Sequence, residues 1–415
     1  MVADVQVASA VLSERAVERQ KRWVLGIVNL SHTINHMNSS MMSILFAVMM
    51  GPLGFGYAEL GVLQTVNTLV SNGLQATYGV IAQYVKRSII LGAGNTLLGL
   101  ASIATSTVTG FPQLVFWRAM AGAGSSPQHP VGSTILSTYF GASRGRALGL
   151  HNTAGNVGTL IAPLLAAVML AVFDWRIVVI IIGIPSVFIG LSYFWLRDVV
   201  RPSDSHRARG RAGWGAYVAC LKNRDLMLVS ALMMVGAAGR GGGINQTYLV
   251  PHFIHDLGIE SAIAASLLTI VNAGGLVGPL AWGWISDRIP RKLAMQASLI
   301  LTAIATVWLG IEGSLGALLL LNLAIYGLVV QARGAITQAM VGDYAGEELE
   351  DAAYSIYFTI GFISAPFWTL LMGAIMQNAG FEVATRVISV SYLVGVLLLI
   401  PLRLKPRQTA RVGAA

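Results

Sequence analysis

The sequence predicts an all-α integral membrane protein with twelve transmembrane helices in two six-helix bundles related by a parallel repeat. Three observations predict this class. Of the 415 residues, 55% are hydrophobic and only 11% are charged, whereas soluble globular proteins carry roughly 25% charged residues. The chain also contains apolar runs of the ~20 residues that a helix needs to cross a bilayer. Finally, two sequence patterns recur at nearly the same offset, which indicates an internal repeat.

The apolar runs divide into two sets of six. They lie at 23–49, 58–83, 88–109, 113–139, 145–172, 175–196, 226–254, 261–285, 293–313, 315–342, 352–378 and 383–402. The domain organisation predicted from them is a cytoplasmic N-terminal segment at 1–22, an N-terminal bundle at 23–196, a cytoplasmic central loop at 197–225, a C-terminal bundle at 226–404 and a cytoplasmic tail at 405–415.

The repeat is supported by two independent markers. Residues 283–292 (GWISDRIPRK) have a weaker copy that begins at Gly79, 204 residues earlier (283 − 79 = 204). A second pattern, Gly-x-x-x-Ala-Pro, occurs in the fifth and eleventh apolar runs at an offset of 203 residues (366 − 163 = 203). Small residues let helices approach closely and proline permits a bend. We therefore expect helix-packing or hinge positions at Gly158, Pro163, Gly361 and Pro366.

The distribution of basic residues predicts the orientation. Lys and Arg gather before the first helix, after the second, fourth and eighth, in the central segment and in the tail, while the opposite connections hold only Arg176 and Arg386. By the positive-inside rule both termini are cytoplasmic. We attribute the net charge of +9 to this orientation. We expect the protein in a plasma (inner) membrane, with the lipid bilayer as its partner and no binding to nucleic acid. The single cysteine excludes an internal disulfide.

The loop at 283–292 and its copy resemble the signature loop of the major facilitator superfamily, and the resemblance covers about residues 20–405. It implies a secondary transporter whose cytoplasmic gate is latched by charged residues of this loop. Gln83 replaces the acid in the first copy, so we expect Asp287 to carry more of the latch. The residues expected at this gate are Gly283, Asp287, Arg288, Arg291, Lys86 and Arg87.

Two subgroups of the family compete. The segment TYLVPHF at 247–253 is similar to monocarboxylate-type carriers. Ser31-His32-x-x-Asn35 and the Gly-rich segment that ends at His129-Pro130 resemble fosmidomycin-resistance-type exporters, although Val131 stands where an acid usually follows. Both comparisons cover short segments, so the subgroup stays open.

The first helix carries a polar face at mid-depth. Asn29, His32 and His36 recur at helical spacing, and a rise of ~1.5 Å per residue puts the histidines roughly 14–20 Å from Trp23. Histidine changes charge near neutral pH, which makes the pair a candidate proton carrier; neutral histidines bonded to neighbouring helices are the alternative. No Asp, Glu or Cys lies on this face to complete a metal site, so we expect no metal and no cofactor.

The charges placed deep in the predicted helices are all positive. Arg118, Arg240 and Arg333 lie within them, and no Asp or Glu falls centrally in any of the twelve. Arginine pairs bidentately with carboxylate and phosphonate, so the pattern favours an anion. Snorkelling of Arg118 and carbonyl bonding of the other two are the structural alternatives. The substrate-binding candidates are Arg240, Arg333, His36, Asn35, Gln331 and Asn245, and the proton-coupling candidates are His32, His36, Arg118 and His129.

These observations predict a secondary active transporter that works by alternating access and couples a proton to a small organic anion. A proton-antiport efflux pump for an antibiotic or metabolite is the alternative. A transporter-like sensor or assembly factor is a third reading, which loss of Asp287 or of the deep charges would favour. No nucleophile, base and orienting acid occur together, so we expect no enzymatic activity. We expect a monomer.

Overall fold

The computed structural model describes residues 2–75, 77–140, 143–195, 214–235, 247–346 and 349–403, and these residues form helices without strands. They belong to two compact units. The first unit comprises Met1–Leu45, Pro52–Gly54 and Val66–Ala208, and the second comprises Phe46–Gly51, Phe55–Thr65 and Arg209–Ala415. The two units are described separately below.

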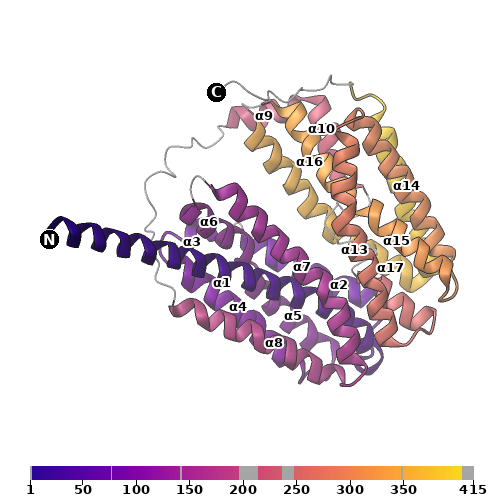
Figure 1. Cartoon of the computed structure of the whole chain (residues 1–415). Helices are drawn as coiled ribbons and strands as arrows, with labels where there is room; N and C mark the ends of the chain where they lie inside the picture. The colour runs from indigo at the N-terminus through magenta and orange to yellow at the C-terminus, as the bar shows by residue number, and fades with distance from the viewer. Residues whose placement is uncertain are drawn as a thin grey trace. The chain divides into compact units, whose positions relative to one another are not determined.

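The first unit is built on long helices (Figure 1). These helices pack through glycines. A Cβ atom at Gly99 of α4 would lie 2.6 Å from the Gly183 carbonyl oxygen of α8, and one at Gly92 would lie 2.9 Å from the Gly190 carbonyl oxygen. Only glycine permits such close backbone contact. The helices that contribute to this unit are α1 (Val2–Leu53), α2 (Tyr57–Gln75), α3 (Tyr78–Ile81), α4 (Arg87–Thr105), α5 (Phe111–Ser125), α6 (Gln128–Phe140), α7 (Arg144–Leu170) and α8 (Trp175–Ser192).

Helices of the second unit also pack closely at a glycine. Gly278 of α13 would place a Cβ atom 2.2 Å from the Leu328 carbonyl oxygen of α15. The last helix contains a turn at Gly380, whose φ of 84° requires glycine and separates two helical spans. The helices of this unit are α9 (Trp214–Lys222), α10 (Arg224–Ala231), α12 (Leu249–Pro251), α13 (Ser261–Ser286), α14 (Arg291–Ile311), α15 (Ala317–Val330), α16 (Ala332–Ala345) and α17 (Glu350–Leu399).

Seven helical stretches of the described chain are long and apolar enough to cross a membrane. The helix is interrupted within two predicted spans, one of which, 315–342, is among these seven stretches as Ala317–Ala345. The span predicted at 113–139 breaks between α5 and α6 at Pro127, and the span at 315–342 breaks between α15 and α16 at Gln331. Proline lacks the N–H that would continue the helix. The two interruptions lie 204 residues apart (331 − 127 = 204), so the internal repeat extends to the backbone.

Two predicted connections contain helix. The segment predicted at 1–22 belongs to α1, in which the Lys21 ammonium lies 2.8 Å from the Glu18 carboxylate one turn earlier. The predicted central loop contains α9, and α10 begins at Arg224, capped by the Asn223 side chain. The glycine run around Arg240 lies outside the described residues.

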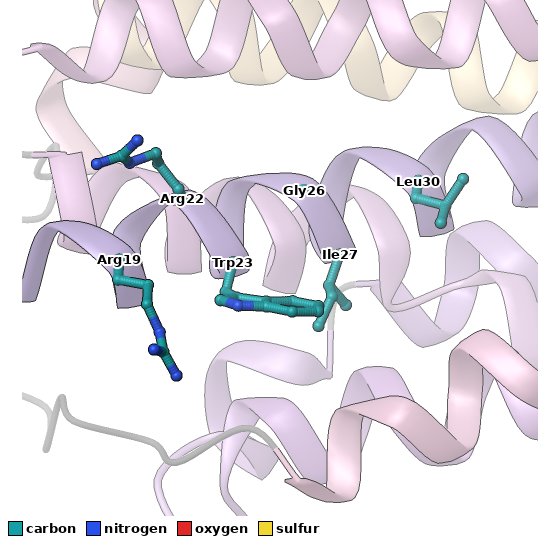
Figure 2. A pocket seen from close by; sticks show the side chains of 6 residues that line it. All are labelled: Arg19, Arg22, Trp23, Gly26, Ile27 and Leu30. Carbon is teal, nitrogen blue, oxygen red and sulfur yellow. The ribbon is translucent and has the colours of Figure 1, made fainter. Parts of the chain in front are cut away.

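A surface groove follows the first membrane-directed turns of α1 (Figure 2). Arg19, Arg22 and Trp23 line one end of it, and Ile27 and Leu30 line the other. Arginine and tryptophan followed by apolar side chains are typical of the membrane–water interface.

Candidate functional site

Four histidines lie together inside the first unit. His32 and His36 come from α1, His129 from α6 and His151 from α7. The ring of His32 stacks on that of His151 with centroids 3.9 Å apart, and it lies 4.6 Å from the ring of His36 and 5.0 Å from that of His129. One nitrogen each of His32, His36 and His129 lie within 4.8 Å of one another. His32, His36 and His129 were named as candidates from the sequence; the packing of α6 and α7 brings them together and adds His151.

Hydrogen bonds fix which nitrogen of two of these rings carries the proton. His32 Nδ1 lies 2.8 Å from the backbone carbonyl oxygen of His151, and a carbonyl can only accept, so Nδ1–H donates. His151 Nδ1 in turn lies 3.2 Å from Asn29 Oδ1. Nε2 of each neutral ring then carries a lone pair, and both Nε2 atoms are buried without a hydrogen-bond partner among the described residues.

The hydroxyl group of Thr159 determines which nitrogen of the His36 ring carries the proton. Its Nδ1 lies 3.2 Å from Thr159 Oγ1, and that hydroxyl donates its only hydrogen to the Gly155 carbonyl oxygen at 3.3 Å. Thr159 Oγ1 therefore accepts from His36 Nδ1–H. The lone pair of the neutral His36 ring is then also on Nε2.

Glycines of α7 make room for this cluster. A Cβ atom at Gly155 would lie 2.8 Å from Cε1 of the His32 ring, and one at Gly158 would lie 2.2 Å from the Thr33 carbonyl oxygen. The α7 backbone therefore lies directly on α1. This contact brings the carbonyl of His151 within hydrogen-bonding distance of His32.

A buried polar network holds α6 in register with α1 beside the cluster. Gln128 Nε2 donates to Ser31 Oγ at 3.0 Å, and Asn95 Nδ2 donates to Gln128 Oε1 at 3.2 Å. Ser31 Oγ also lies 2.6 Å from the Tyr193 hydroxyl. Ser31 and Gln128 directly precede His32 and His129 in sequence, so the network positions both rings. No role was predicted from the sequence for these residues or for His151, although His151 shares a helix face with Gly155 and Gly158.

The buried charges of the described residues are both arginines. Arg118 is 3% exposed in the first unit and Arg333 is 4% exposed in the second, while no Asp or Glu whose side chain is described is buried. Arg333 Nη1 donates to the Val235 carbonyl oxygen at 3.2 Å, and its guanidinium lies 4.7 Å from the centre of the Tyr392 ring. These contacts orient the Arg333 guanidinium.

Of the remaining substrate-binding candidates, two lie within the residues that the structure describes and two lie outside them. Asn35 is 5% exposed, and its Nδ2 has no hydrogen-bond partner among the described residues. Gln331 stands at the break between α15 and α16, where its amide lies against Gly275 of α13. Arg240 and Asn245 lie outside the described residues.

The signature loop joins α13 to α14. Asp287 follows the end of α13, its side chain is 68% exposed, and it lies 3.7 Å from Arg291. Arg291 has a nearer acid in Asp343 of α16, both of whose carboxylate oxygens lie 2.5 Å from Nη1. Asp343 is 52 residues away in sequence, and the sequence analysis did not include it among the gate residues.

The other gate candidates make contacts of their own within the part of the chain that the structure describes. The Arg288 guanidinium stacks 3.4 Å from the centre of the Trp284 ring. Gly283 faces open space. Lys86 and Arg87 begin α4 in the first unit, and their relation to the loop at 283–292 stays a prediction.

We expect the Arg291–Asp343 pair to stabilise the second unit more than the Arg291–Asp287 pair. The first pair has short contacts to both carboxylate oxygens, and its side chains are 33% and 24% exposed, whereas Asp287 is mostly solvated. Double-mutant cycles on the thermal stability of the purified protein should give a coupling of about 1 kcal/mol for Arg291–Asp343 and below ~0.5 kcal/mol for Arg291–Asp287. Equal couplings would contradict this assignment.

The segment that resembles monocarboxylate-type carriers forms a π-helical turn at His252–Asp256 in the second unit. Asp256 accepts a hydrogen bond from the Tyr57 hydroxyl at 2.9 Å and lies 2.7 Å from His252 Nδ1. Burial alone would raise the pKa of Asp256, but these hydrogen bonds outweigh it and lower the pKa below its ordinary value. Asp256 is therefore ionised at neutral pH and joins the start of α2 to this turn.

The predicted hinge residues lie inside helices, Pro163 in α7 and Pro366 in α17. The two glycines of the repeat differ in their surroundings. Gly158 meets backbone atoms of α1, whereas a Cβ atom at Gly361 would meet only the end of the flexible Met233 side chain.

Comparison with known proteins places the chain among membrane transporters. The sequence profile of the Major Facilitator Superfamily matches residues 28–248 and 237–414. The probable L-galactonate transporter of Escherichia coli is 24% identical over 408 residues, which cover 91% of this chain and 88% of that protein. The fosmidomycin resistance protein of Escherichia coli is 24% identical over 292 residues, which cover 67% and 68%. The crystal structure of the nucleoside transporter NupG matches with a TM-score of 0.76 at 13% identity and covers 91% of this chain and 98% of that one.

Proposed function

The chain belongs to the major facilitator superfamily of membrane transporters, and we propose that it carries a small organic anion, of carboxylate or phosphonate type, by proton-coupled secondary active transport. In this proposal the substrate site opens alternately to each side of the membrane. The protein would lie in the plasma (inner) membrane of a bacterium with both termini in the cytoplasm, as the distribution of Lys and Arg favours.

The main support for an anionic substrate is the positive sign of the buried charges. Arg118 and Arg333 are buried, and no described Asp or Glu side chain is. Positively charged side chains in the interior favour a negatively charged ligand over a positively charged one. The planar fork of arginine also fits carboxylate and phosphonate oxygens in a bidentate manner. A site for organic cations would instead be expected to contain a buried acid.

Two further observations support an anion. Asn35 offers a buried N–H group without a partner among the described residues, and a buried donor of this kind needs an acceptor. The L-galactonate in the name of one relative is a carboxylate. Arg333 and Asn35 are therefore the described residues that we assign to anion binding, with Arg240 as a further candidate.

Charge balance supports coupling to protons. Moving one negative charge against a membrane potential costs about 2.3 kcal/mol per 100 mV, and a proton that travels with a monovalent anion cancels this cost. Sodium is less suitable, because hard cations are bound by oxygen ligands that commonly include carboxylates, and no described carboxylate is buried. Histidines of the cluster in the first unit are the candidate carriers of the proton.

A thermal-shift screen tests the proposal. Carboxylates, phosphonates, sugars and organic cations are added to the purified protein in detergent at pH 6 and pH 8. A ligand that binds only the folded protein raises its melting temperature. We expect one class of anions to stabilise the protein, and to do so more at the lower pH if anion and proton bind together.

Each anion should be paired with its uncharged amide or ester as a control of the same shape. Stabilisation by the amide as strong as by the acid would show that charge is not recognised. Stabilisation only by sugars or organic cations would contradict the proposed substrate class.

Export of an antibiotic or metabolite by proton antiport is the second candidate. It is favoured by the likeness to the fosmidomycin resistance protein. Flux in inside-out vesicles separates the two: a symporter accumulates the anion when the vesicle exterior is the more acidic side, and an antiporter accumulates it when the vesicle interior is the more acidic side.

A further inference from the structure

We propose that His32, His36 and His129 form a binding site for one divalent transition metal ion, of which Zn²⁺ is the representative. This site goes beyond the proposed transport function, and an ion bound there would hold these imidazoles neutral, so it would compete with the proton that the same histidines are proposed to carry. It differs from the expectation of no metal, which considered ligands on a single helix face. The structure adds a third imidazole from α6.

The orientation of the rings is the first argument. In metal sites a ligating histidine almost always donates its other N–H to a carbonyl, carboxylate or water, which fixes the tautomer. His32 shows this arrangement: Nδ1 donates to the His151 carbonyl oxygen, and Nε2 is buried with its lone pair unpartnered. His36 repeats it through Thr159. Both rings already have the outer hydrogen bonds that a metal ligand needs.

The distances are the second argument. Zinc binds imidazole nitrogen at about 2.0–2.1 Å, so two nitrogens of a tetrahedral site lie roughly 3.4 Å apart. The three nitrogens here lie within 4.8 Å of one another. His32 is buried, His36 is half-buried and His129 is exposed. A rotation of the exposed His129 ring is therefore the smallest movement that closes the site, and the same exposure lets an ion enter.

The ligand type decides the class of ion. Imidazole nitrogens suit Zn²⁺, Cu²⁺ and Ni²⁺, whereas Ca²⁺ and Mg²⁺ need oxygen ligands. Three neutral imidazoles leave the charge of the ion uncompensated and a fourth position open to water or to an anionic oxygen. His151 is not needed as a ligand; its carbonyl positions His32.

Direct binding measurements on protein without a histidine tag test the site. After chelation and buffer exchange, Zn²⁺ is titrated by calorimetry, and Co²⁺ is used as a spectroscopic substitute. We expect one ion per chain and the intense visible absorption of tetrahedral Co²⁺. His129→Ala and His36→Ala should each weaken Zn²⁺ binding by at least ~100-fold, more than the 10–100-fold that outer-shell changes typically cause.

His255→Gln is the matched control, because this histidine lies in the second unit and contacts the Ala47 carbonyl oxygen. Its Zn²⁺ affinity should equal that of the wild type. Unchanged affinity in His129→Ala, with an unchanged melting temperature, would overturn the proposal, as would only the weak spectrum of hydrated Co²⁺ in the wild type. These readouts do not involve transport, so the metal site can fail while the proposed function stands.

Discussion

Replacing Arg333 with alanine is expected to weaken anion binding by about 100-fold or more, because removing one partner of a buried, hydrogen-bonded charge pair costs roughly 2–5 kcal/mol. Arg333 is buried and directed by the Val235 carbonyl and the Tyr392 ring. The measurement is the concentration of the stabilising anion that gives half of the maximal thermal shift. Arg333→Lys keeps the charge but loses the planar fork, so we expect an intermediate loss.

Arg386→Ala is the matched control for Arg333→Ala. This arginine belongs to the same unit, is 60% exposed and pairs with Glu382, so its loss should leave anion binding unchanged. The melting temperatures without ligand show whether Arg333→Ala folds. If folded Arg333→Ala and Arg333→Lys both bind the anion like the wild type, Arg333 is a structural residue and the assignment is wrong.

Gly158→Ala is expected to destabilise the protein, whereas Gly361→Ala at the repeat-related position is expected to be neutral or slightly stabilising. A Cβ atom at Gly158 would lie 2.2 Å from the Thr33 carbonyl oxygen and 3.1 Å from the Met37 nitrogen, and neither backbone atom can move alone. Overpacking of this kind costs about 1–3 kcal/mol. At Gly361 only the end of Met233 must shift, and alanine gains up to ~1 kcal/mol of helix propensity.

The two glycine variants are compared by thermal and denaturant-induced unfolding in the same detergent. A lower melting temperature for Gly158→Ala and an equal or higher one for Gly361→Ala is the expected result. Equal stabilities would mean that α7 can move away from α1 at low cost. In that case the contact would not hold His32 and His151 together.

The family and the helical architecture could be predicted from the sequence, because both depend on local patterns. The apolar runs indicate transmembrane helices, and the loop at 283–292 with its earlier copy indicates the repeat. The family profile confirms the predicted membership of the major facilitator superfamily. Breaks inside spans were harder to predict. Pro127 is a visible signal, but its counterpart Gln331 is not a helix breaker, and its conformation depends on packing against Gly275.

The candidate site could be predicted only where it lies on one helix. His32 and His36 were found because residues spaced by four share a face. His129 was already a proton-coupling candidate from the sequence, but its place beside His32 and the contributions of His151 and Asp343 arise from contacts between helices. Helical periodicity contains no information about which neighbour a face meets. For the same reason the sequence analysis counted metal ligands on one helix and expected no site. It did identify Arg118 and Arg333 as charges within the predicted spans, and both are buried.

The most direct test of the central claim, that buried arginines make this protein a carrier of anions, is solute uptake by proteoliposomes. The protein is reconstituted without a tag, and uptake of the anion that stabilises it is compared with uptake of its uncharged amide under an imposed pH gradient. The account predicts that the gradient drives accumulation of the anion, that the amide is not accumulated, and that Arg333→Ala abolishes the uptake. Equal uptake of acid and amide, or transport of a cation in their place, would contradict it.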